Sequence, residues 1–316
     1  MILITGGLGY LGGRIADHLL KTGHTEIALG TCRSCVKVPF ALKECKITTI
    51  DLLDDESLDR ACKGVSVIIH LAALNAQACV DDPEKALMIN GLGTLKLLQA
   101  ATRKGVSKFI YFSTAHVYGS PLIGKLNEDT LPRPVHPYAI THRVAEDYVI
   151  EASVKGDVDG VILRLSNAIG APLDSAANCW MLIVNDLCRQ AVESMELKLQ
   201  SSGLQQRNFI SINDVVRVVE SIAYAHDGGD TGEIYNLGGD KSISVIEIAK
   251  LVAARYKKES RILLEVKMSK EDLGSDESEL DYQVGKVISA GYLKSITPIE
   301  HDIDEVLYFC RKTFTN

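Results

Sequence analysis

The amino-terminal segment Met1–Gly13, MILITGGLGYLGG, constrains the fold more than any other part of this chain. It begins with the apolar run Ile2–Ile4, which predicts a short buried strand, and glycines follow at positions 6, 7, 9 and 12, with a fifth at 13. Their spacing fits both the Rossmann fingerprint G-x-G-x-x-G and the variant G-x-x-G-x-x-G. Glycines at such a turn let the backbone fold back sharply and approach a pyrophosphate closely.

The residues after the glycines predict a helix over Arg14–Thr22, with apolar residues on one face and Gly23 at its end. A helix N-terminus carries a partial positive charge that attracts phosphate. A strand, a glycine turn and a helix in this order predict a dinucleotide site. The alternative is a glycine turn that binds no ligand.

Composition limits the classes of partner. The 316 residues are 46% hydrophobic and 24% charged, which is typical of a globular protein, and the formal net charge is −7. An acidic chain argues against nucleic acid and against a membrane surface as partners. The chain has no apolar run of about 18 residues, and Met1 leads directly into the first strand without room for a signal peptide. We therefore expect a cytoplasmic protein.

Eight cysteines are present, and most lie inside apolar runs, as free cysteines do in a reducing compartment. Cys32-x-x-Cys35 is the only close pair. Without a second pair or a nearby histidine to complete four ligands, a zinc site is not expected. The sequence predicts no metal.

The end of the second strand, predicted over Thr25–Thr31, bears on the choice of cofactor. An acidic residue about 20 positions after the glycines would bind the ribose hydroxyls of NAD, whereas an arginine suits the extra phosphate of NADP. This chain has Gly30, Thr31 and Arg33 in that region and no acid. Arg33 favours NADP over NAD, unless it is simply a solvated loop residue.

A third strand is predicted over Ile47–Ile50, and Asp51 and Leu52 follow it. This carboxylate and this apolar side chain are candidates for flanking an adenine edge. Alternatively, Asp51 or Asp54 caps the helix predicted over residues 54–62. The next apolar run, Val65–Leu71, leads into Ala72 and Ala73, whose small side chains would let a cofactor lie close to the strand end.

Strands and helices alternate through the first half of the chain, with a long helix over Asp82–Lys104 and a strand over Phe109–Phe112. This alternation predicts an α/β fold with a doubly wound parallel sheet. We expect residues 1–165 to form the Rossmann-type domain and residues 166–316 to form a smaller substrate lobe interleaved with the sheet. In this lobe the pattern predicts helices over Met181–Leu187, Val215–Ala223 and Ile243–Tyr256. It also predicts a turn at Gly238–Gly239 and a charged loop over Lys267–Glu279.

Two further segments carry the chemistry, Phe112–Gly119 (FSTAHVYG) and His136–Arg143 (HPYAITHR). With the glycine loop they resemble the extended short-chain dehydrogenases, the NAD(P)-dependent nucleotide-sugar epimerases and dehydratases. The resemblance runs almost end to end. Its other matches, in order, are His70-Leu-Ala-Ala73, Asn90, Arg164-x-x-Asn167-x-x-Gly170, Arg207-Asn-Phe-Ile210 leading to Asp214, and Tyr235-Asn-Leu-Gly238.

The resemblance implies that Thr114 hydrogen-bonds the sugar and that Tyr138 is the acid or base at the carbinol. A phenol with an ordinary pKa near ~10 is a poor base at neutral pH unless a positive charge is near. The family places a lysine four residues later, on the same helix face, and this chain has His142 there. A histidine is largely neutral at pH 7 unless its pKa is shifted. Arg143 points about 100° away around a helix and is a poor replacement.

Three interpretations of His142 stay open: a working substitute for the lysine, an enzyme with reduced or pH-shifted turnover, and a binding protein without catalysis.

His116 is a second departure from the family pattern. Family dehydratases carry an acidic pair where this chain has Ala115 and His116, so dehydration is disfavoured. His116 is either an acid or base that contacts the sugar or a residue that holds its loop.

The resemblance implies that Asn167 and Arg207 bind the phosphates and the sugar of the substrate. Arg207 is also a candidate ion-pair partner of Asp214, and Asn208 replaces the family's aspartate. Arg164 fits a core salt bridge as well as a ligand contact.

The sequence therefore predicts an NAD(P)-dependent enzyme that epimerises a nucleotide sugar by transient oxidation. The alternatives are an NADPH-dependent reductase of a keto sugar or other ketone, and a catalytically weak sensor or scaffold that binds NAD(P). The resemblance implies a homodimer paired through the helices over Asp82–Lys104 and Tyr138–Ala152. The residues expected to bind the cofactor are Gly6, Gly9, Tyr10, Leu11, Gly12, Thr31, Arg33, Asp51, Leu52, Leu71, Ala72, Ala73, Asn90, Tyr138 and His142.

Overall fold

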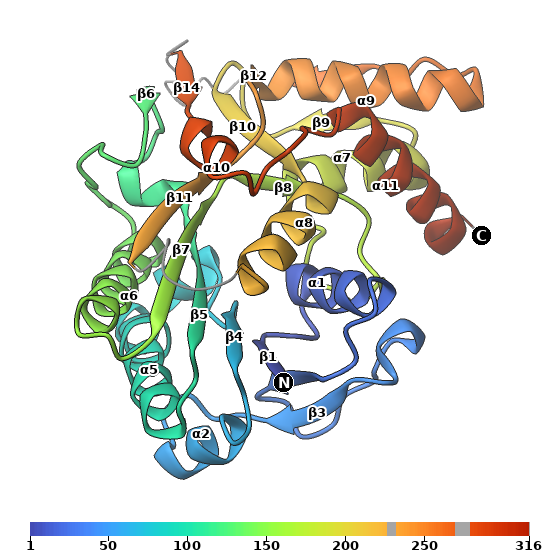
Figure 1. Cartoon of the computed structure of the whole chain (residues 1–316). Helices are drawn as coiled ribbons and strands as arrows, with labels where there is room; N and C mark the ends of the chain where they lie inside the picture. Colours follow the sequence, from blue (N-terminus) through green and yellow to red (C-terminus); the bar gives the residue numbers. More distant parts are fainter. Residues whose placement is uncertain (226–231, 269–278, 316) are drawn as a thin grey trace. The chain divides into compact units, whose positions relative to one another are not determined.

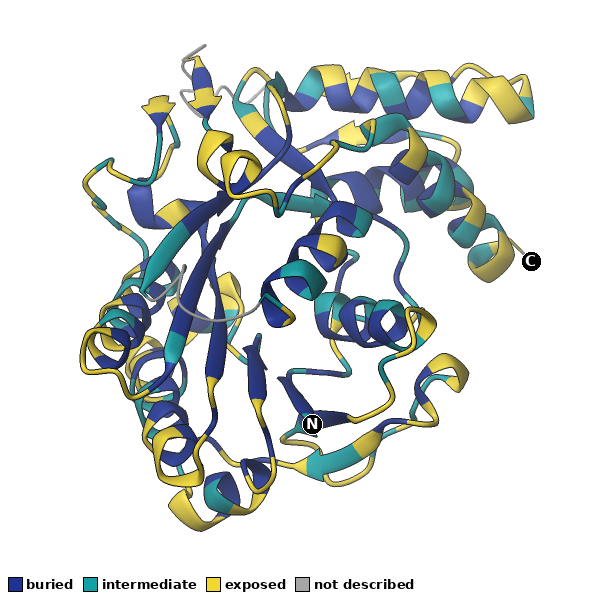
Figure 2. Cartoon of the chain, viewed as in Figure 1, coloured by how far each residue is buried: buried dark blue, intermediate teal, exposed yellow. Residues whose placement is uncertain are grey.

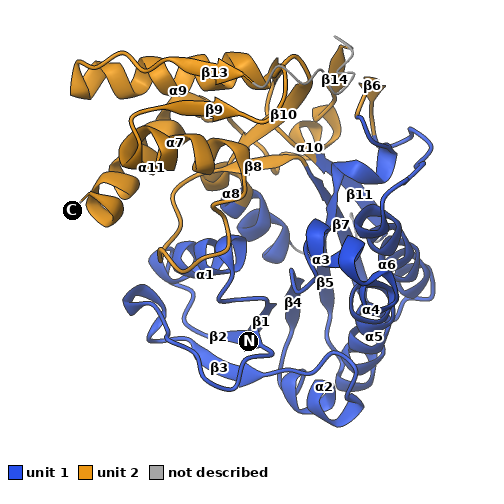
Figure 3. Cartoon of the chain, turned by 180° about the vertical axis from the view of Figure 1, so that it is seen from behind, with its two compact units in different colours: residues 1–121, 128–165, 216–236 blue, residues 122–127, 166–215, 237–316 orange. Residues whose placement is uncertain are grey.

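The computed structural model describes residues 1–225, 232–268 and 279–315. The chain divides into two compact units, shown in blue and orange in Figure 3. Unit 1 comprises Met1–Pro121, Glu128–Leu165 and Val216–Asn236, and unit 2 comprises Leu122–Asn127, Ser166–Val215 and Leu237–Asn316.

Unit 1 is built on a seven-stranded sheet with the strand order β11-β7-β5-β4-β1-β2-β3. The pairs that join β7, β5, β4, β1, β2 and β3 are all parallel, which confirms the doubly wound parallel sheet predicted from the alternation of elements. The strands are β1 (Ile2–Thr5), β2 (Ile27–Thr31), β3 (Lys46–Thr49), β4 (Val67–His70), β5 (Lys108–Thr114), β7 (Asp159–Leu165) and β11 (Glu233–Leu237).

Helices cover both faces of this sheet, which is why every residue of β1, β4 and β5 is buried (Figure 2). Helices α2, α5 and α6 share one core cluster with the strands, and α1 and α8 lie on the opposite face (Figure 1). The helices of this unit are α1 (Tyr10–Lys21), η1 (Phe40–Leu42), α2 (Asp55–Ala61), α3 (Ala76–Asp81), α4 (Pro83–Ala86), η2 (Leu87–Leu92), α5 (Gly93–Lys104), η3 (Ala115–Tyr118), α6 (Pro137–Val154) and most of α8 (Ile212–Ala223).

The long helix predicted over Asp82–Lys104 is not one regular α-helix. Asp82 caps the short helix α4, and a π-helical segment, η2, separates α4 from α5. In η2 the Asn90 carbonyl accepts a hydrogen bond from the Thr94 hydroxyl at 2.6 Å. Such side-chain bonding to a carbonyl one turn back accompanies helix distortion, and apolar periodicity does not reveal it.

Two aspartates were candidates for the cap of α2, and the structure selects Asp54. Its carboxylate accepts a hydrogen bond from the Glu56 N–H at 3.1 Å. The Asp51 carboxylate instead accepts from the Leu53 N–H at 2.9 Å, which fixes the turn between β3 and α2.

Unit 2 contains a three-stranded sheet, β12-β10-β8, and two strand pairs, β13-β9 and β14-β6. Helices α7, α9 and α11 pack together over a second core cluster. The elements are β6 (Gly124–Leu126), β8 (Asn167–Ile169), α7 (Ile183–Glu193), β9 (Leu197–Leu199), β10 (Gln206–Ser211), β12 (Ser242–Ser244), α9 (Val245–Ser260), β13 (Val266–Met268), β14 (Leu280–Tyr282), α10 (Gly285–Ser289) and α11 (Ile299–Phe314).

Three predictions for this unit need correction. The helix predicted over Met181–Leu187 is α7, which begins at Ile183 and continues to Glu193. The helix predicted from Ile243 begins at Val245, because Ser244 and Glu247 form a capping box and Ile243 belongs to strand β12. The predicted loop Lys267–Glu279 begins inside a strand, because Lys267 and Met268 belong to β13, and residues 269–278 lie outside the described part of the chain. In the described ranges, no helix has the length and apolar character needed to cross a membrane.

Candidate active site

The glycine loop connects β1 to α1 in a conformation that side chains cannot share. Gly6 has a φ of +65°, in the left-handed region that favours glycine. A Cβ on Gly12 would overlap the carbonyl oxygen of Gly6, and one on Gly7 would lie 2.8 Å from the carbonyl oxygen of Ile4. The cap residue of α1, Gly9, has no side chain to satisfy the first N–H groups of the helix. This cradle therefore fits a dinucleotide pyrophosphate.

The loop lies where the strand order of the sheet reverses, between β1 and β4. A Cβ on Gly6 would lie 3.2 Å from the backbone nitrogen of Ala72, so the loop contacts the predicted cofactor segment Leu71–Ala73 directly. The Thr5 hydroxyl accepts hydrogen bonds from the N–H groups of Leu71 and Ala72 at 3.1 and 3.2 Å. Open α/β sheets bind their ligands at this position.

The predicted adenosine-side residues lie at the ends of the neighbouring strands β2 and β3, which pair in parallel. Thr31 ends β2, and its hydroxyl accepts from the Arg33 N–H at 3.2 Å. Arg33 is exposed, and no carboxylate in the described part of the chain pairs with its guanidinium. Asp51 is exposed and Leu52 is 8% exposed after β3.

Thr114 ends strand β5 and caps η3, because its hydroxyl accepts from the His116 N–H at 3.2 Å. The segment η3 packs against α6, the helix that carries Tyr138. His136 caps α6 through its Nδ1 atom, which accepts from the Tyr138 N–H at 3.3 Å. The two predicted reacting residues thus occupy the start of two elements in contact. The His116 side chain is exposed.

Tyr138 is partly buried, and desolvation raises the pKa of its phenol to about 12, with a smaller contribution from the nearby Cys79 thiol. Desolvation penalises the charged phenolate, so the pKa moves away from neutral pH. A base at this position needs a positive charge from elsewhere.

His142 is 2% exposed, and burial lowers its pKa to about 4, against the opposing effects of the Tyr138 carbonyl and Glu146. Its ring centroid lies 4.2 Å from that of Tyr138. Its Nδ1 atom lies 2.8 Å from the Tyr138 carbonyl oxygen. Because a carbonyl oxygen only accepts, Nδ1 carries the proton and Nε2 is an acceptor. His142 is therefore neutral at pH 7.

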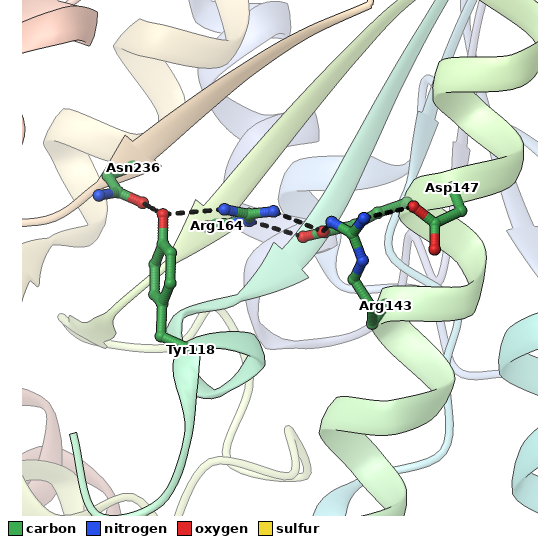
Figure 4. A network of polar contacts seen from close by, with 6 residues as sticks. Tyr118, Arg143, Asp147, Arg164 and Asn236 are labelled. Atoms are coloured by element: carbon green, nitrogen blue, oxygen red, sulfur yellow. Dashed lines mark hydrogen bonds and ion pairs between the residues drawn. The ribbon is translucent and has the colours of Figure 1, made fainter. Parts of the chain in front are cut away.

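Arg143 does not supply the missing charge. Its guanidinium donates to Glu146 at 3.0 Å and to Asp147 at 2.5 Å, on the side of α6 that faces the buried network of Figure 4. This agrees with the expectation that one residue further along the helix points away from Tyr138.

Arg164 belongs to a buried salt bridge, which decides between its two interpretations. It is 1% exposed and donates twice to the Glu146 carboxylate, at 2.9 and 2.8 Å. It also donates to the Tyr118 hydroxyl at 2.9 Å, and that hydroxyl donates to Asn236 at 2.6 Å (Figure 4). Because Glu146 is fully buried and Arg164 donates to both of its oxygens, this ion pair holds α6 in place.

Sequence reasoning missed a buried hydrogen-bond chain beneath the site. The Thr94 hydroxyl donates to the Asn90 carbonyl, so it accepts from the His70 Nε2 atom at 3.0 Å. The His70 Nδ1 atom then accepts from the Thr5 hydroxyl at 2.7 Å. Burial and the nearby His142 lower the pKa of His70 to about 3. These hydrogen bonds link the start of the glycine loop to η2.

From η2 these hydrogen bonds continue to helix α6, which carries Tyr138. The Asn90 side chain accepts from the Leu74 N–H at 2.8 Å and donates to the Thr141 hydroxyl at 3.1 Å. Thr141 donates to the Tyr138 carbonyl at 3.0 Å. Asn90 was predicted from the resemblance, whereas Thr94 and Thr141 have no sequence signal beyond their place on helices.

Two of the residues predicted to contact substrate, Asn167 and Arg207, lie in unit 2, whereas His116 lies in unit 1. The Asn167 amide donates to the Asn208 carbonyl at 2.8 Å. Arg207 is exposed, and no described carboxylate pairs with it. The suggested pairing with Asp214 is wrong, because the buried Asp214 accepts from the Thr297 N–H at 2.8 Å and from the Thr297 hydroxyl at 2.7 Å.

Asn208, which replaces the family's aspartate, is buried in a backbone turn. Its carbonyl oxygen accepts from the Gly239 N–H at 2.9 Å, and its amide nitrogen donates to the Gly239 and Lys241 carbonyls at 3.1 and 3.3 Å. An amide can accept from the Gly239 N–H and donate to both carbonyls, whereas an ionised carboxylate can only accept. In the part of the chain that the structure describes, no group of three or more His, Cys, Asp or Glu residues is placed to hold a metal ion.

Comparisons with known proteins agree with this arrangement. The model of the NAD dependent epimerase/dehydratase family matches residues 2–238. A dTDP-D-glucose 4,6-dehydratase of Mus musculus is 28% identical over 332 residues, covering 100% of this chain and 90% of that protein. The Thermus thermophilus UDP-glucose 4-epimerase in complex with NAD has the same fold, with a TM-score of 0.82, 24% identity and 99% of each chain covered.

A third similar structure is RMD from Pseudomonas aeruginosa complexed with NADPH, with a TM-score of 0.78, 23% identity, and 98% of this chain and 99% of that chain covered. The family match spans most of the chain, including the glycine loop, Tyr138 and His142. The chain belongs to the NAD-dependent epimerase/dehydratase family of enzymes.

Proposed function

We propose that this protein is a nucleotide-sugar epimerase that oxidises and re-reduces one sugar hydroxyl without net use of its cofactor. The observation that carries the proposal is the segment after Thr114. In that segment Ala115 is buried and small and His116 is exposed, and no carboxylate follows Thr114 to drive elimination of water. Thr114 and Tyr138 supply the side-chain hydroxyls that a reversible hydride transfer to a bound nicotinamide uses.

In this proposal Thr114 donates a hydrogen bond to the reacting hydroxyl and Tyr138 exchanges its proton. An oxidised nicotinamide dinucleotide, when bound, supplies the hydride acceptor and a positive charge close to the phenol. Neutral His142 orients the ribose by accepting a hydrogen bond at Nε2, since Nδ1 is bonded to the Tyr138 carbonyl. Because His142 carries no charge, Tyr138 keeps a high pKa and turnover increases toward alkaline pH.

We propose NADP as the cofactor in preference to NAD. Arg33 is exposed at the end of β2, in a stretch, residues 28–43, that contains Arg33, Lys37 and Lys43 and no acidic residue. A guanidinium with no carboxylate partner suits a 2′-phosphate. An acid that would bind both ribose hydroxyls of NAD is absent from this stretch.

The proposed substrate is a sugar linked to a nucleoside diphosphate. Arg207 supports this, because a guanidinium with no described ion-pair partner can bind a diphosphate with paired hydrogen bonds, and burial lowers the pKa of Arg207. Asn167, held by its bond to the Asn208 carbonyl, is proposed as a second contact.

We also propose a homodimer through residues 82–104 and 138–152. Helix α6 and segment η2 expose large apolar side chains at Leu87, Met88, Ile140 and Tyr148. Exposed apolar side chains that gather on adjacent helices are typical of a protein interface.

The test is an epimerisation assay on a panel of UDP- and dTDP-linked sugars, with no cofactor added and products separated by chromatography. We expect interconversion of one pair of epimers with no change in NADPH absorbance, and we expect Tyr138→Phe to abolish it. Net consumption of NADPH with a 4-keto sugar would favour a reductase instead. Dinucleotide binding with no turnover that depends on Tyr138 would favour a sensor or scaffold.

A further inference from the structure

The two cysteines of the Cys32-x-x-Cys35 pair differ from the rest of the thiols in this chain. Both are exposed, whereas the other six cysteines are buried. They lie in the loop between β2 and η1, separated by two residues. Burial protects a thiol from exchange, and exposure makes it available, so the structure singles out these two sulfurs as a reactive pair.

The pair surrounds a residue of the proposed cofactor site. Arg33, the proposed partner of the 2′-phosphate, lies between the two cysteines in the chain, and its N–H donates to the hydroxyl of Thr31 at 3.2 Å. A change in the backbone between Cys32 and Cys35 therefore moves the guanidinium that this phosphate would meet.

The electrostatic setting favours an anionic oxidant. Residues 28–43 carry three basic residues and no acidic one, in a chain whose net charge is −7. Reactive cysteines are typically found in exposed, electropositive surroundings. Glutathione disulfide is anionic at neutral pH, so this loop attracts it more than the acidic surface as a whole does.

We propose that Cys32 and Cys35 are a reversible thiol–disulfide pair, oxidised by glutathione disulfide, that weakens dinucleotide binding when closed. One cysteine thiolate attacks glutathione disulfide, forming a mixed disulfide and releasing one glutathione thiolate. The second cysteine thiolate attacks the cysteine sulfur of the mixed disulfide and releases the other glutathione. The two cysteine protons pass to the two glutathione thiolates, so two cysteines are oxidised and one glutathione disulfide is reduced.

The effect on binding follows from the geometry of a disulfide. Its two Cα atoms must lie about 4.4–6.8 Å apart, so the bond restricts the backbone of Arg33 and Ser34 between them. The closed loop holds Arg33 away from the 2′-phosphate, and the loss of one charge-assisted contact weakens NADPH binding by about tenfold. This effect on affinity rests on the proposed cofactor site, whereas formation of the disulfide does not.

The experiment equilibrates the full chain in glutathione buffers from fully reduced to fully oxidised. Free thiols are then blocked with N-ethylmaleimide under native conditions, and the protein is analysed by intact mass and peptide mapping. NADPH affinity is measured on the same samples by fluorescence titration. We expect a disulfide between Cys32 and Cys35, about tenfold weaker NADPH binding in the oxidised sample, and full recovery with dithiothreitol. The double variant C32S/C35S should bind NADPH equally in every buffer.

The single variants C32S and C35S separate the chemical steps. Each should stop at the mixed disulfide with glutathione, because no second thiol is present to resolve it. The six buried cysteines serve as internal controls and should be blocked only after denaturation.

Two results would overturn the proposal: no Cys32–Cys35 disulfide in fully oxidised buffer, or a disulfide that leaves NADPH affinity unchanged. If neither redox form binds any nicotinamide dinucleotide while the mass data still show the disulfide, the proposed cofactor site fails and so does the regulatory effect. The modification site itself would then stand on the mass data.

Discussion

The Nδ1 atom of His142 donates a hydrogen bond of 2.8 Å to the carbonyl oxygen of Tyr138, one turn earlier on the same helix. This bond places the proton of the imidazole on the atom that faces the helix backbone and leaves Nε2 as an acceptor. At the position where the family has a charged lysine, this chain therefore carries a neutral group.

His142→Lys tests this consequence directly. A lysine ammonium near Tyr138 stabilises the phenolate and lowers the pKa of the phenol, so the ascending limb of the pH–rate profile should shift to lower pH and activity at pH 7 should increase. The measurement is kcat against pH for both proteins. Arg143→Lys is the matched control, because Arg143 pairs with Glu146 and Asp147 and keeps its charge. Superimposable profiles for wild type and His142→Lys would refute the electrostatic argument.

The buried histidine also makes stability depend on pH. The pKa of His142 is lowered to about 4 in the folded protein and is about 6.5 when unfolded, so protonation favours the unfolded chain. Its contribution is complete above pH ~6.5 and is lost as pH falls toward the folded value, by up to about 1.4 kcal/mol per pH unit. The free energy of unfolding is measured by urea titration at several pH values in this range. Its dependence on pH should be shallower for His142→Gln than for wild type.

The matched control for that slope is His301→Gln, since His301 is mostly exposed in α11. It should unfold with the wild-type dependence on pH. An unchanged slope in His142→Gln would mean that His142 is not protonated on unfolding in this range.

Breaking the buried pair of Arg164 and Glu146 should destabilise unit 1. Glu146→Gln leaves the Arg164 guanidinium buried without its carboxylate, and the expected loss in free energy of unfolding is about 3–5 kcal/mol. Asp147→Asn removes only the exposed partner of Arg143 and should cost under about 1 kcal/mol. Denaturant titration of the two variants side by side makes the comparison, and equal losses would show that burial of the pair has no special cost.

Arg33→Ala tests the proposed preference for NADP. Loss of the guanidinium should weaken NADPH binding by about tenfold or more and leave NADH binding nearly unchanged. The measurement is the ratio of the two dissociation constants. Lys21→Ala is the control, because Lys21 pairs with Asp17 at the far end of α1. An unchanged ratio in Arg33→Ala would place the 2′-phosphate elsewhere or remove it from the proposal.

The pattern of the first half of the chain predicted most of the parallel sheet, but not strand β11, which comes from Glu233–Leu237. Apolar runs such as Ile2–Ile4 and Val65–Leu71 predicted strands because a parallel sheet covered on both faces needs continuous apolar residues. The glycine spacing predicted the turn between β1 and α1 because no side chain fits there. Both are local consequences of residue type.

The features that could not be predicted depend on partners distant in the chain. Nothing in the spacing of Asp214 reveals that it bonds Thr297, and nothing in Thr94 predicts the π-helical segment before it. The burial of His142 is likewise set by packing. It lowers the pKa of this histidine from the ordinary value of about 6.5 to about 4, so the imidazole is neutral at pH 7.

An epimerase of the proposed kind holds its cofactor and regenerates it within each turnover, and the released dinucleotide tests this most directly. The purified protein is denatured, and the nicotinamide dinucleotide in the supernatant is identified by mass and quantified against the chain. We expect close to one dinucleotide per chain, carrying a 2′-phosphate. Protein that purifies without dinucleotide, and binds NADPH only when it is added, would contradict the epimerase and point to a reductase that exchanges its cofactor.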